Sequence, residues 1–269
     1  MKKTGIVVAS PAKKIRLRDI SPDDTGEVKD KIEARERLPK LHERLAELQA
    51  ALYAENKRSL LIVFQAMDTG GKDGALRSLL TGVDPAGLQV TSFKAPTSTE
   101  LEHDFLWRIH AATPAKGIIG VWNRSHYEDV LIVRVHDLVK KDIWRARYEH
   151  INNFEKMLAG SGVTILKFFF HISKDEQKER LQARLDDPKK NWKFNAGDLK
   201  ERKLWNDYQK AYEDAINECS TQVAPWRIVP ANHKWARDVA VSEEVVKTLE
   251  AMNPQYPKAD FDPKSIVIE

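Results

Sequence analysis

The sequence predicts an α/β fold, a parallel central sheet with helices on both faces. Five short apolar runs are typical of buried strands, because they are continuous rather than alternating, as in strands covered on both sides. Helical patterns separate these runs, and alternation of strand and helix is typical of a parallel sheet. The chain has 269 residues, 42% of them apolar, which is enough for one sizeable core. We therefore expect a single domain over residues 1–269.

An N-terminal arm and a long helix are predicted to occupy about residues 1–57. Residues 1–28 mix a basic stretch with turn-forming residues and show no clear period, which is typical of an arm lying over another element. The helix is predicted over residues 27–57, where leucines recur at alternating three- and four-residue spacing and form one apolar stripe. Pro39 is expected to cut or kink this helix near its middle.

The remaining elements alternate in type along the chain. Strands are predicted over residues 59–65, 88–93, 117–122, 163–172 and 226–230. Capping patterns and apolar stripes predict the helices between them, from Thr97 with Glu100 to His110, over residues 143–158, and from Ser173 with Glu176 to Leu185.

A glycine-rich segment at residues 66–74, Ala-Met-Asp-Thr-Gly-Gly-Lys-Asp-Gly, follows the first strand and precedes a helical stretch. It resembles the phosphate-loop template G-x-x-x-x-G-K-[ST], which Gly71 and Lys72 fit. Ala66 stands in place of the first glycine, and Asp73 stands in place of the hydroxyl residue. Such a loop turns backbone N–H groups toward an anion at a helix N-terminus, and a lysine adds a full charge. We expect phosphate to be bound by Gly70, Gly71, Lys72, Asp73 and Gly74; the alternative is a glycine-rich turn without a ligand.

Two carboxylates, Asp68 and Asp73, lie in this anion-binding segment. Alone they would repel phosphate, whereas Mg²⁺ binds carboxylate and phosphate together through oxygen. The sequence therefore predicts a metal-bridged site with Asp68 as the leading ligand, for Mg²⁺ or, as a substitute, Mn²⁺.

Polar residues also follow the strand that ends at Trp122. Ligands of open α/β sheets bind at the carboxyl ends of strands, so residues 123–129 are candidates for the same site. Arg124 is suited to clamp a transferring phosphoryl group, and Glu128 or Asp129 to hold metal or orient a nucleotide. His126 is either a catalytic base or a structural hydrogen-bonding group; the structural role is favoured because phosphoryl transfer mainly needs positioning and charge neutralisation.

A basic segment at about residues 178–203 is predicted to be a mobile lid. Cations and the aromatic pair Trp192 and Phe194 occur together there, and a lid that docks on an anion needs both charge and apolar contact. Its candidate anion-binding residues are Arg180, Arg184, Lys189, Lys190 and Lys193. The alternative is a solvated helix face with a loop.

Composition restricts the class of protein. The single cysteine, Cys219, cannot form an internal disulfide or a cysteine-rich metal site. The N-terminal apolar stretch is too short for a signal peptide and no run approaches the length of a membrane span. We expect a cytoplasmic protein that binds neither membrane nor nucleic acid and that forms a homo-oligomer, a dimer or a tetramer. The net charge of +4 is mild, so the local placement of cations is more informative than their number.

Several long blocks together resemble the polyphosphate kinase 2 family, and the resemblance covers nearly the whole chain. These blocks span residues 66–74, 123–130, 167–177 and 184–194. In detail the sequence is similar to the class III branch, which phosphorylates both nucleoside monophosphates and diphosphates. The resemblance implies a P-loop kinase fold like that of thymidylate kinase, with a helical lid over the site.

The resemblance also implies roles for individual residues. Lys72 would grip phosphate, Asp68 would help to hold Mg²⁺, and Arg124 and Arg184 match arginines on the polyphosphate side. Asn123 occupies a Walker B-like position where other branches have Asp, which removes one negative charge. Glu128, with Asp129, would then act on the nucleotide side.

The expected activity is transfer of the terminal phosphoryl group of inorganic polyphosphate to AMP and then ADP, reversibly and with Mg²⁺. The candidate catalytic residues are Asp68, Lys72, Asn123 and Arg124, and ATP is the final product. One alternative is an ordinary nucleoside monophosphate kinase that uses ATP. The other is a non-catalytic module that binds polyanions through the basic segment, but this leaves Asp68 and Asp73 unexplained.

Overall fold

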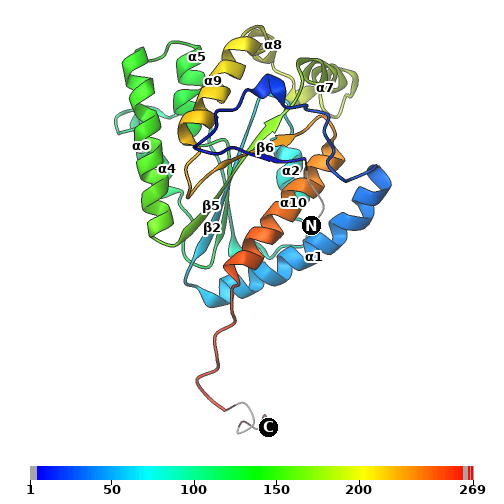
Figure 1. Ribbon diagram of the computed structural model, residues 1–269, viewed down its shortest axis with the longest axis vertical. Coiled ribbons are helices and arrows are strands. Elements are labelled where there is room, and N and C mark those ends of the chain that lie inside the picture. Colours follow the sequence, from blue (N-terminus) through cyan, green and yellow to red (C-terminus); the bar gives the residue numbers. More distant parts are fainter. Residues whose placement is uncertain (1–4, 263–265, 267, 269) are drawn as a thin grey trace.

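The computed structural model describes residues 5–262, 266 and 268. Within them lies one six-stranded sheet with the order β1-β6-β5-β2-β4-β3 (Figure 1). Strand β1 is antiparallel to β6, and every other neighbouring pair is parallel. The strands are β1 Val7–Val8, β2 Ser59–Ala66, β3 Leu88–Ser92, β4 Ile119–Asn123, β5 Val163–His171 and β6 Trp226–Pro230.

All five predicted strands are confirmed, with ends that differ by at most two residues. Strand β1 was not predicted. It lies within the predicted arm, where Val7 pairs with Ile228 and Val8 with Arg227 at the edge of the sheet. A two-residue strand has too little sequence for a period to be recognised. The first four residues of the predicted arm lie outside the described part of the chain.

Helices cover both faces of the sheet, so the predicted three-layer α/β fold is confirmed. Figure 1 shows α1 and α10 side by side on one face and α6 on the other. The helices are α1 Lys31–Glu55, α2 Lys72–Leu79, α3 Ser98–Leu101, α4 Trp107–Ala111, α5 Ile132–Val135, α6 Lys141–Gly160, α7 Lys174–Asp186, α8 Ala196–Lys203, α9 Trp205–Cys219 and α10 Lys234–Met252, with 3₁₀ turns η1 Leu17–Asp19, η2 Pro85–Gly87, η3 His126–Val130 and η4 Asn191–Lys193. None of these helices, over the residues described, has the length and apolarity needed to cross a membrane.

Strand β2 divides the core because successive side chains point to opposite faces of the sheet. Leu60 and Ile62 belong to the apolar cluster that includes Leu52 of α1. Leu61 and Val63 belong to a second cluster, which includes Phe154 and Leu158 of α6. All eight residues of β2 are buried, which explains why the strand is continuously apolar in sequence.

Pro39 was predicted to cut or kink helix α1; the helix is continuous through Pro39, so it is not cut there. Proline removes one backbone hydrogen bond, that to the carbonyl of Arg35, and Arg35 is exposed. Asp30 caps the helix by accepting from the N–H groups of Ile32 and Glu33 at 2.8 and 2.9 Å, which sets its start four residues later than predicted.

The helix predicted from Thr97 to His110 consists of two short helices, α3 and α4. The predicted capping box between Thr97 and Glu100 is present. The interruption lies at Asp104, whose side chain accepts from the N–H of Leu106 at 2.9 Å. A side chain that bonds its own local backbone competes with the helical pattern, which accounts for the break.

Candidate functional site

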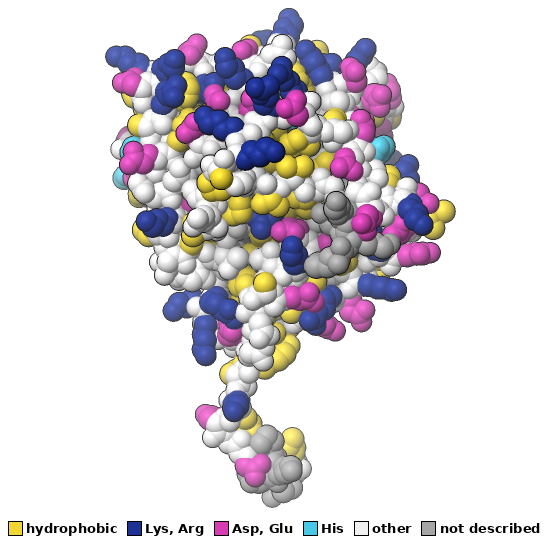
Figure 2. Space-filling model, in the orientation of Figure 1, with side chains coloured by type: hydrophobic (Ala, Val, Ile, Leu, Met, Phe, Trp, Pro, Cys, Tyr) yellow, Lys and Arg dark blue, Asp and Glu magenta, His cyan; other side chains and the backbone are white. Residues whose placement is uncertain are grey.

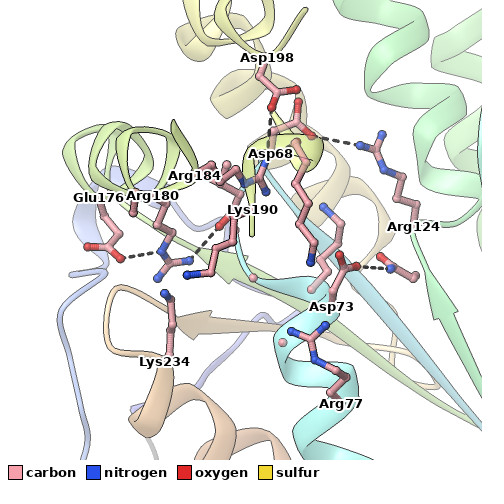
Figure 3. Close-up of a pocket in the computed structure, with 18 of the residues that line it drawn as sticks. Asp68, Asp73, Arg77, Arg124, Glu176, Arg180, Arg184, Lys190, Asp198 and Lys234 are labelled. Carbon is pink, nitrogen blue, oxygen red and sulfur yellow. Dashed lines mark hydrogen bonds and ion pairs between the residues drawn. The ribbon is translucent and has the colours of Figure 1, made fainter. Parts of the chain in front are cut away.

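A cavity of about 700 Å³ opens at the carboxyl ends of β2 and β4, between the glycine-rich loop and α7 (Figure 3). It lies where ligands of α/β sheets bind. The predicted site residues that line it are Asp68, Gly70, Gly71, Lys72, Asp73, Gly74, Asn123, Arg124, Arg180, Arg184, Lys190 and Lys193.

The glycine-rich loop joins β2 to α2. Its backbone conformation is favourable for a glycine at one position and strained for the residue at another. Gly71 is the N-cap of α2 with a φ of 95°, a value that favours glycine. A side chain at Gly71 would collide with the guanidinium of Arg237, which packs against the loop. Thr69 also has a positive φ, 62°, and this is strained for a β-branched residue. The surrounding protein must therefore hold the loop in shape.

Helix α7 holds the loop from outside. Gln177 donates from Nε2 to the carbonyl of Asp68 at 3.1 Å, and Arg180 donates from Nη1 to the carbonyl of Thr69 at 3.0 Å. Both side chains are buried, with 1% and 8% exposure. A loop that turns its N–H groups toward an anion turns its carbonyl groups outward. The two helix side chains donate hydrogen bonds to these carbonyl groups and so satisfy them.

Arg180 is therefore engaged mainly with protein. It also donates from Nε to Glu176 at 2.6 Å, and from Nη2 to the carbonyls of Ala231 and Asn232 at 2.5 and 3.1 Å. Four of its five N–H groups are thus used in joining α7 to the loop and to the end of β6.

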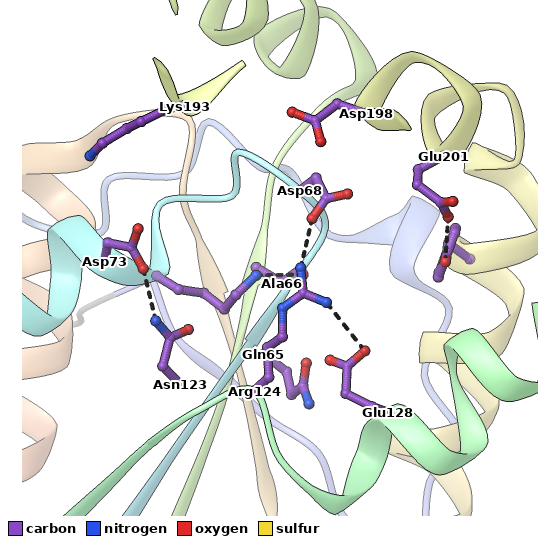
Figure 4. Close-up of polar contacts among 12 residues, drawn as sticks. Gln65, Ala66, Asp68, Asp73, Asn123, Arg124, Glu128, Lys193, Asp198 and Glu201 are labelled. Atoms are coloured by element: carbon purple, nitrogen blue, oxygen red, sulfur yellow. Dashed lines mark hydrogen bonds and ion pairs between the residues drawn. The ribbon is translucent and has the colours of Figure 1, made fainter. Parts of the chain in front are cut away.

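Lys72 lies at the base of the cavity. It is 9% exposed, and its Nζ donates to the carbonyl of Ala66 at 3.0 Å (Figure 4). Burial lowers the pKa of Lys72 to about 8, helped by the nearby charge of Arg124 and opposed by Asp68 and Glu128. An anionic group in the loop would restore the charged form, since an opposite charge nearby favours it.

Arg124 stands between two carboxylates. Its Nη2 donates to Asp68 at 3.1 Å, and its Nη1 lies 3.5 Å from Glu128 (Figure 4). The backbone of Arg124 has a φ of 65°, and its N–H donates to the carbonyl of Phe64. This strained turn directs the side chain from the end of β4 toward the glycine-rich loop, and strain of this kind is concentrated at functional sites.

Asn123 and Asp73 contact each other across the cavity floor. The side-chain amide of Asn123 donates to Asp73 at 2.8 Å (Figure 4). An aspartate at position 123 would place two carboxylates at this distance, where they would repel each other. The asparagine therefore fits the aspartate at position 73, which occupies the place of a hydroxyl residue.

The residues present fit a magnesium ion that is shared with substrate. No group of three or more His, Cys, Asp or Glu within the described residues is arranged to hold a metal ion by itself. Asp68 lines the cavity and engages Arg124 through Oδ1. Mg²⁺ in phosphoryl-transfer sites is bound through one or two carboxylates together with substrate phosphates. Asp68 is the residue best placed for this.

The predicted lid consists of the end of α7, turn η4 and helix α8. Arg184 is ion-paired with Asp198 at 3.2 Å (Figure 3). Lys190 is ion-paired with Asp187 at 2.6 Å. Lys189 is exposed and does not line the cavity. The structure therefore brings Arg184, Lys190 and Lys193 to the cavity and leaves Lys189 outside.

The two predicted nucleotide-side residues are not among those that line the cavity. Glu128 reaches it only through Arg124. Asp129 accepts from Nη1 of Arg147 at 3.2 Å, and burial raises the pKa of Asp129 to about 6 despite this partner.

His126 is buried in a polar cluster behind the end of β4. Its Nε2 lies 3.3 Å from Glu155, which also accepts from Tyr127 at 2.9 Å and from Lys167 at 2.6 Å. Burial lowers the pKa of His126. Lys167 donates also to the carbonyl of Cys219 at 2.7 Å. This cluster supports the structural role favoured for His126, because it fixes the turn that carries Arg124.

Sequence reasoning missed four cations of the cavity, namely Arg77, Lys94, Lys234 and Arg237. Lys94 comes two residues after β3, and Lys234 and Arg237 lie in the first turn of α10, just after β6. The rule that ligands bind at the carboxyl ends of strands applies to β3 and β6 also and would have found these three cations, whereas Arg77 lies in the last turn of α2. Arg237 is 2% exposed, and its Nη1 has no hydrogen-bond partner within the described chain.

Comparison with known proteins agrees with this geometry. Residues 28–257 match the model of the family described as polyphosphate kinase 2. The chain is 52% identical, over 96% of its length and 97% of the relative, to a Meiothermus ruber protein named AMP/ADP-polyphosphate phosphotransferase. It is 49% identical, over 80% of its length and 79% of the relative, to a Rhodopseudomonas palustris protein named ADP-polyphosphate phosphotransferase.

A solved structure shows the same fold. The crystal structure of polyphosphate kinase 2 from Arthrobacter aurescens TC1 superimposes with a TM-score of 0.92 at 46% identity, covering 96% of this chain and 95% of that one. With a family match over most of the chain and relatives of about half identical sequence, the assignment is direct. The chain belongs to the polyphosphate kinase 2 family.

Proposed function

We propose that this protein transfers the terminal phosphoryl group of inorganic polyphosphate to AMP and to ADP. The observation that carries the proposal is the cavity itself, where the glycine-rich loop, Lys72 and Arg124 face the cations Arg184, Lys190 and Lys193. A site for a single nucleotide phosphate has no use for cations that extend so far from the loop. The names and similarity of the two relatives described above support the same donor and acceptors.

The chain's own residues act by positioning and by electrostatics. The loop N–H groups and Lys72 hold donor phosphate, and Arg124 faces the developing charge on the transferred group. No general base is needed, since the acceptor phosphate is already an anionic nucleophile. His126, buried behind β4, is accordingly free of any chemical role. The reaction exchanges one phosphoanhydride for another, so it is reversible and ATP serves as the donor in the opposite direction.

Magnesium belongs to the proposal through Asp68. Bound there, Mg²⁺ would neutralise phosphate oxygens and so offset the carboxylates of Asp68 and Asp73. Manganese, which also accepts oxygen ligands, is the expected substitute.

The segment from residue 178 to 203 is proposed to act as a lid. Arg184 and Asp198 form an ion pair at the cavity, and Arg184 would exchange Asp198 for a donor phosphate. Lys189, outside the cavity, would add only long-range attraction. Glu128 would act on the acceptor side through its contact with Arg124. For Asp129 we propose a structural role as the partner of Arg147.

A donor comparison tests the proposed function. Purified protein with Mg²⁺ and AMP is given polyphosphate or ATP, and ADP and ATP formation is followed; ADP as acceptor is tested in the same way. We expect faster transfer from polyphosphate to both acceptors. Faster transfer from ATP to AMP would favour an ordinary monophosphate kinase, and binding of polyphosphate without transfer from either donor would favour a polyanion-binding module.

A homo-oligomer, dimer or tetramer, is part of the proposal. Large apolar side chains such as Leu101, Leu138 and Trp107 are 69%, 63% and 46% exposed on the single chain, and association would cover such surfaces. Sedimentation at low and high protein concentration would show a monomer if this is wrong.

A further inference from the structure

A second cavity, of about 600 Å³, lies beneath the N-terminal arm and takes no part in the site described above. Its walls come from the turn η1, from the residues that follow β5, and from helix α9. Helix α7 contributes to both cavities, with Lys174 in this one and Glu176 and Arg180 in the catalytic one. Both cavities therefore open at the same end of the sheet.

The arm that forms the roof is held firmly on α9. Asn217 accepts from the N–H of Ile15 at 2.9 Å and donates to the carbonyl of Ile15 at 3.0 Å. Glu213 accepts from the N–H of Leu17 at 2.8 Å, and Leu17 is buried. Figure 1 shows this part of the arm, in dark blue, crossing beside α9. The cavity is thus formed by fixed elements.

Positive charge dominates this cavity. Four cations line it, Arg16, Arg18, Lys174 and Lys210, against the one carboxylate of Glu213. Arg18 is 3.8 Å from Asp19, while the other three cations have no ion-pair partner in the part of the chain that the structure describes. Figure 2 shows Lys and Arg side chains at the top of the molecule, over the region of the arm, with Asp and Glu side chains among them.

The floor of the cavity contains one unpaired polar side chain. His171 is 6% exposed and is held against the arm, since its Nε2 faces the carbonyl of Ile20 at 3.2 Å and the backbone of Leu17 is a second hydrogen-bonding neighbour. Gln209 also lines the cavity, and its buried Nε2 has no hydrogen-bond partner among the described residues. Buried polar groups are normally paired, so this amide indicates a missing partner such as a water molecule.

We propose that this cavity binds an oligophosphate, and that its ligand during turnover is the distal part of the polyphosphate donor. Cations spread around a cavity of this size suit a ligand with several charges better than a single small anion. The identity of the ligand rests on the proposed function, because only a polymeric donor extends beyond the catalytic cavity. Binding the chain at two places raises its effective concentration at the loop.

The test compares donor lengths in the double variant Arg16→Ala/Lys210→Ala, which leaves α7 unchanged. Arg16 and Lys210 are exposed, so we expect the KM for long-chain polyphosphate to rise about fivefold, as the loss of two surface ion contacts implies, with kcat unchanged. The slope of log KM against log salt should fall by about 1.4, or about 0.7 for each cation lost. The KM for a short oligophosphate donor should not change, because one such molecule cannot reach both cavities and gains nothing at the loop from the second one.

The matched control is Lys40→Ala/Lys57→Ala, which removes two exposed cations from α1 and its C-terminal end. It should leave both KM values as they are. Melting temperatures of all variants should equal that of the unchanged protein, so that a loss of fold is recognised. An equal rise of KM in the control would show a general charge effect and would overturn the proposal.

Calorimetric titration with tripolyphosphate and with ATP separates the two sources of oligophosphate. A second bound equivalent that the double variant loses, together with the long-donor effect, supports the donor as ligand. The same loss with no change in either KM overturns the donor as ligand and assigns the cavity to a free oligophosphate or nucleotide. If neither titration nor kinetics distinguishes the variant, the cavity is no anion site. Failure of the proposed function would give a different result from failure of this inference: the unchanged protein would transfer no phosphoryl group from polyphosphate.

Discussion

The pH dependence of donor use follows from the position of Lys72. Burial at the base of the cavity lowers its pKa to about 8 in the free protein. A lysine with a lowered pKa is charged below that value and neutral above it, so donor binding weakens as the pH rises through 8. One pH unit above the pKa, about one tenth of the molecules carry the charge. The kcat/KM for polyphosphate, which reports the free enzyme, should therefore fall about tenfold between neutral pH and pH 9.

Bound phosphate changes this behaviour in a way that can be measured. The anion stabilises the ammonium form and raises the pKa of Lys72 in the complex. We therefore expect kcat at saturating polyphosphate to stay level to a higher pH than kcat/KM does. Initial rates at saturating AMP and varied polyphosphate, taken over a range of pH on both sides of 8, provide both curves.

Two variants complete this experiment. Lys72→Ala should lower kcat/KM by about 10²–10³, the usual cost of one preorganised electrostatic group, and leave the fold intact. In Lys72→Arg the guanidinium stays charged throughout, so the remaining activity should lose its dependence on pH near 8. The reasoning is refuted by a wild-type kcat/KM that is level well above pH 8, or by near-normal turnover of Lys72→Ala.

Three further predictions concern residues around the loop. Asp68→Asn should raise the Mg²⁺ concentration needed for half-maximal rate and lower the rate; activity that persists in excess chelator would contradict the role of Asp68. Arg184→Ala should raise the KM for polyphosphate or lower kcat with little change in the KM for AMP, and Lys189→Ala should have a weaker effect on the same constants; equal effects would remove the distinction between them. Gln177→Leu leaves the carbonyl of Asp68 without its partner, at a cost of about 1–3 kcal/mol in loop stability. It should lower kcat with any donor, whereas the exposed control Lys178→Ala should match wild type in the same rate assay.

Most of the sheet could be predicted from sequence because buried parallel strands have a strong local signal. Strand β2 is apolar at nearly every position, and its observed bounds, Ser59–Ala66, extend the prediction by one residue. The break at Asp104 depends on a single side-chain hydrogen bond that competes with the helical backbone pattern, and apolar periodicity does not report it. The continuity of α1 through Pro39 depends on solvent reaching one carbonyl, which is a property of the folded surface.

The site could be predicted where it is formed by residues that follow a recognisable strand in the sequence. Asp68 and Lys72 lie in the segment that joins β2 to α2, Arg124 comes directly after β4, and the structure places all three at one cavity. The support of the loop by Gln177 and Arg180 could not be predicted, since these residues follow the loop by more than a hundred positions and meet it only through the docking of α7. Arg180 and Arg184 carry the same charge and both line the cavity. Only the geometry shows that Arg180 holds three backbone carbonyls of the loop and of the chain after β6, whereas Arg184 contacts Asp198 and the carbonyl of Lys193.

The single thiol of this protein is chemically protected. Cys219 is fully buried, burial raises its pKa to about 12, and the chain has no other cysteine. Only the thiolate reacts readily, so maleimide dyes should leave the folded protein unlabelled. A cysteine introduced at Lys189, at the tip of the proposed lid, would then be the sole position that is labelled. The buried native cysteine would not have to be replaced first. A fluorophore there would report whether the segment moves when polyphosphate is added, which makes lid closure observable in solution and in real time.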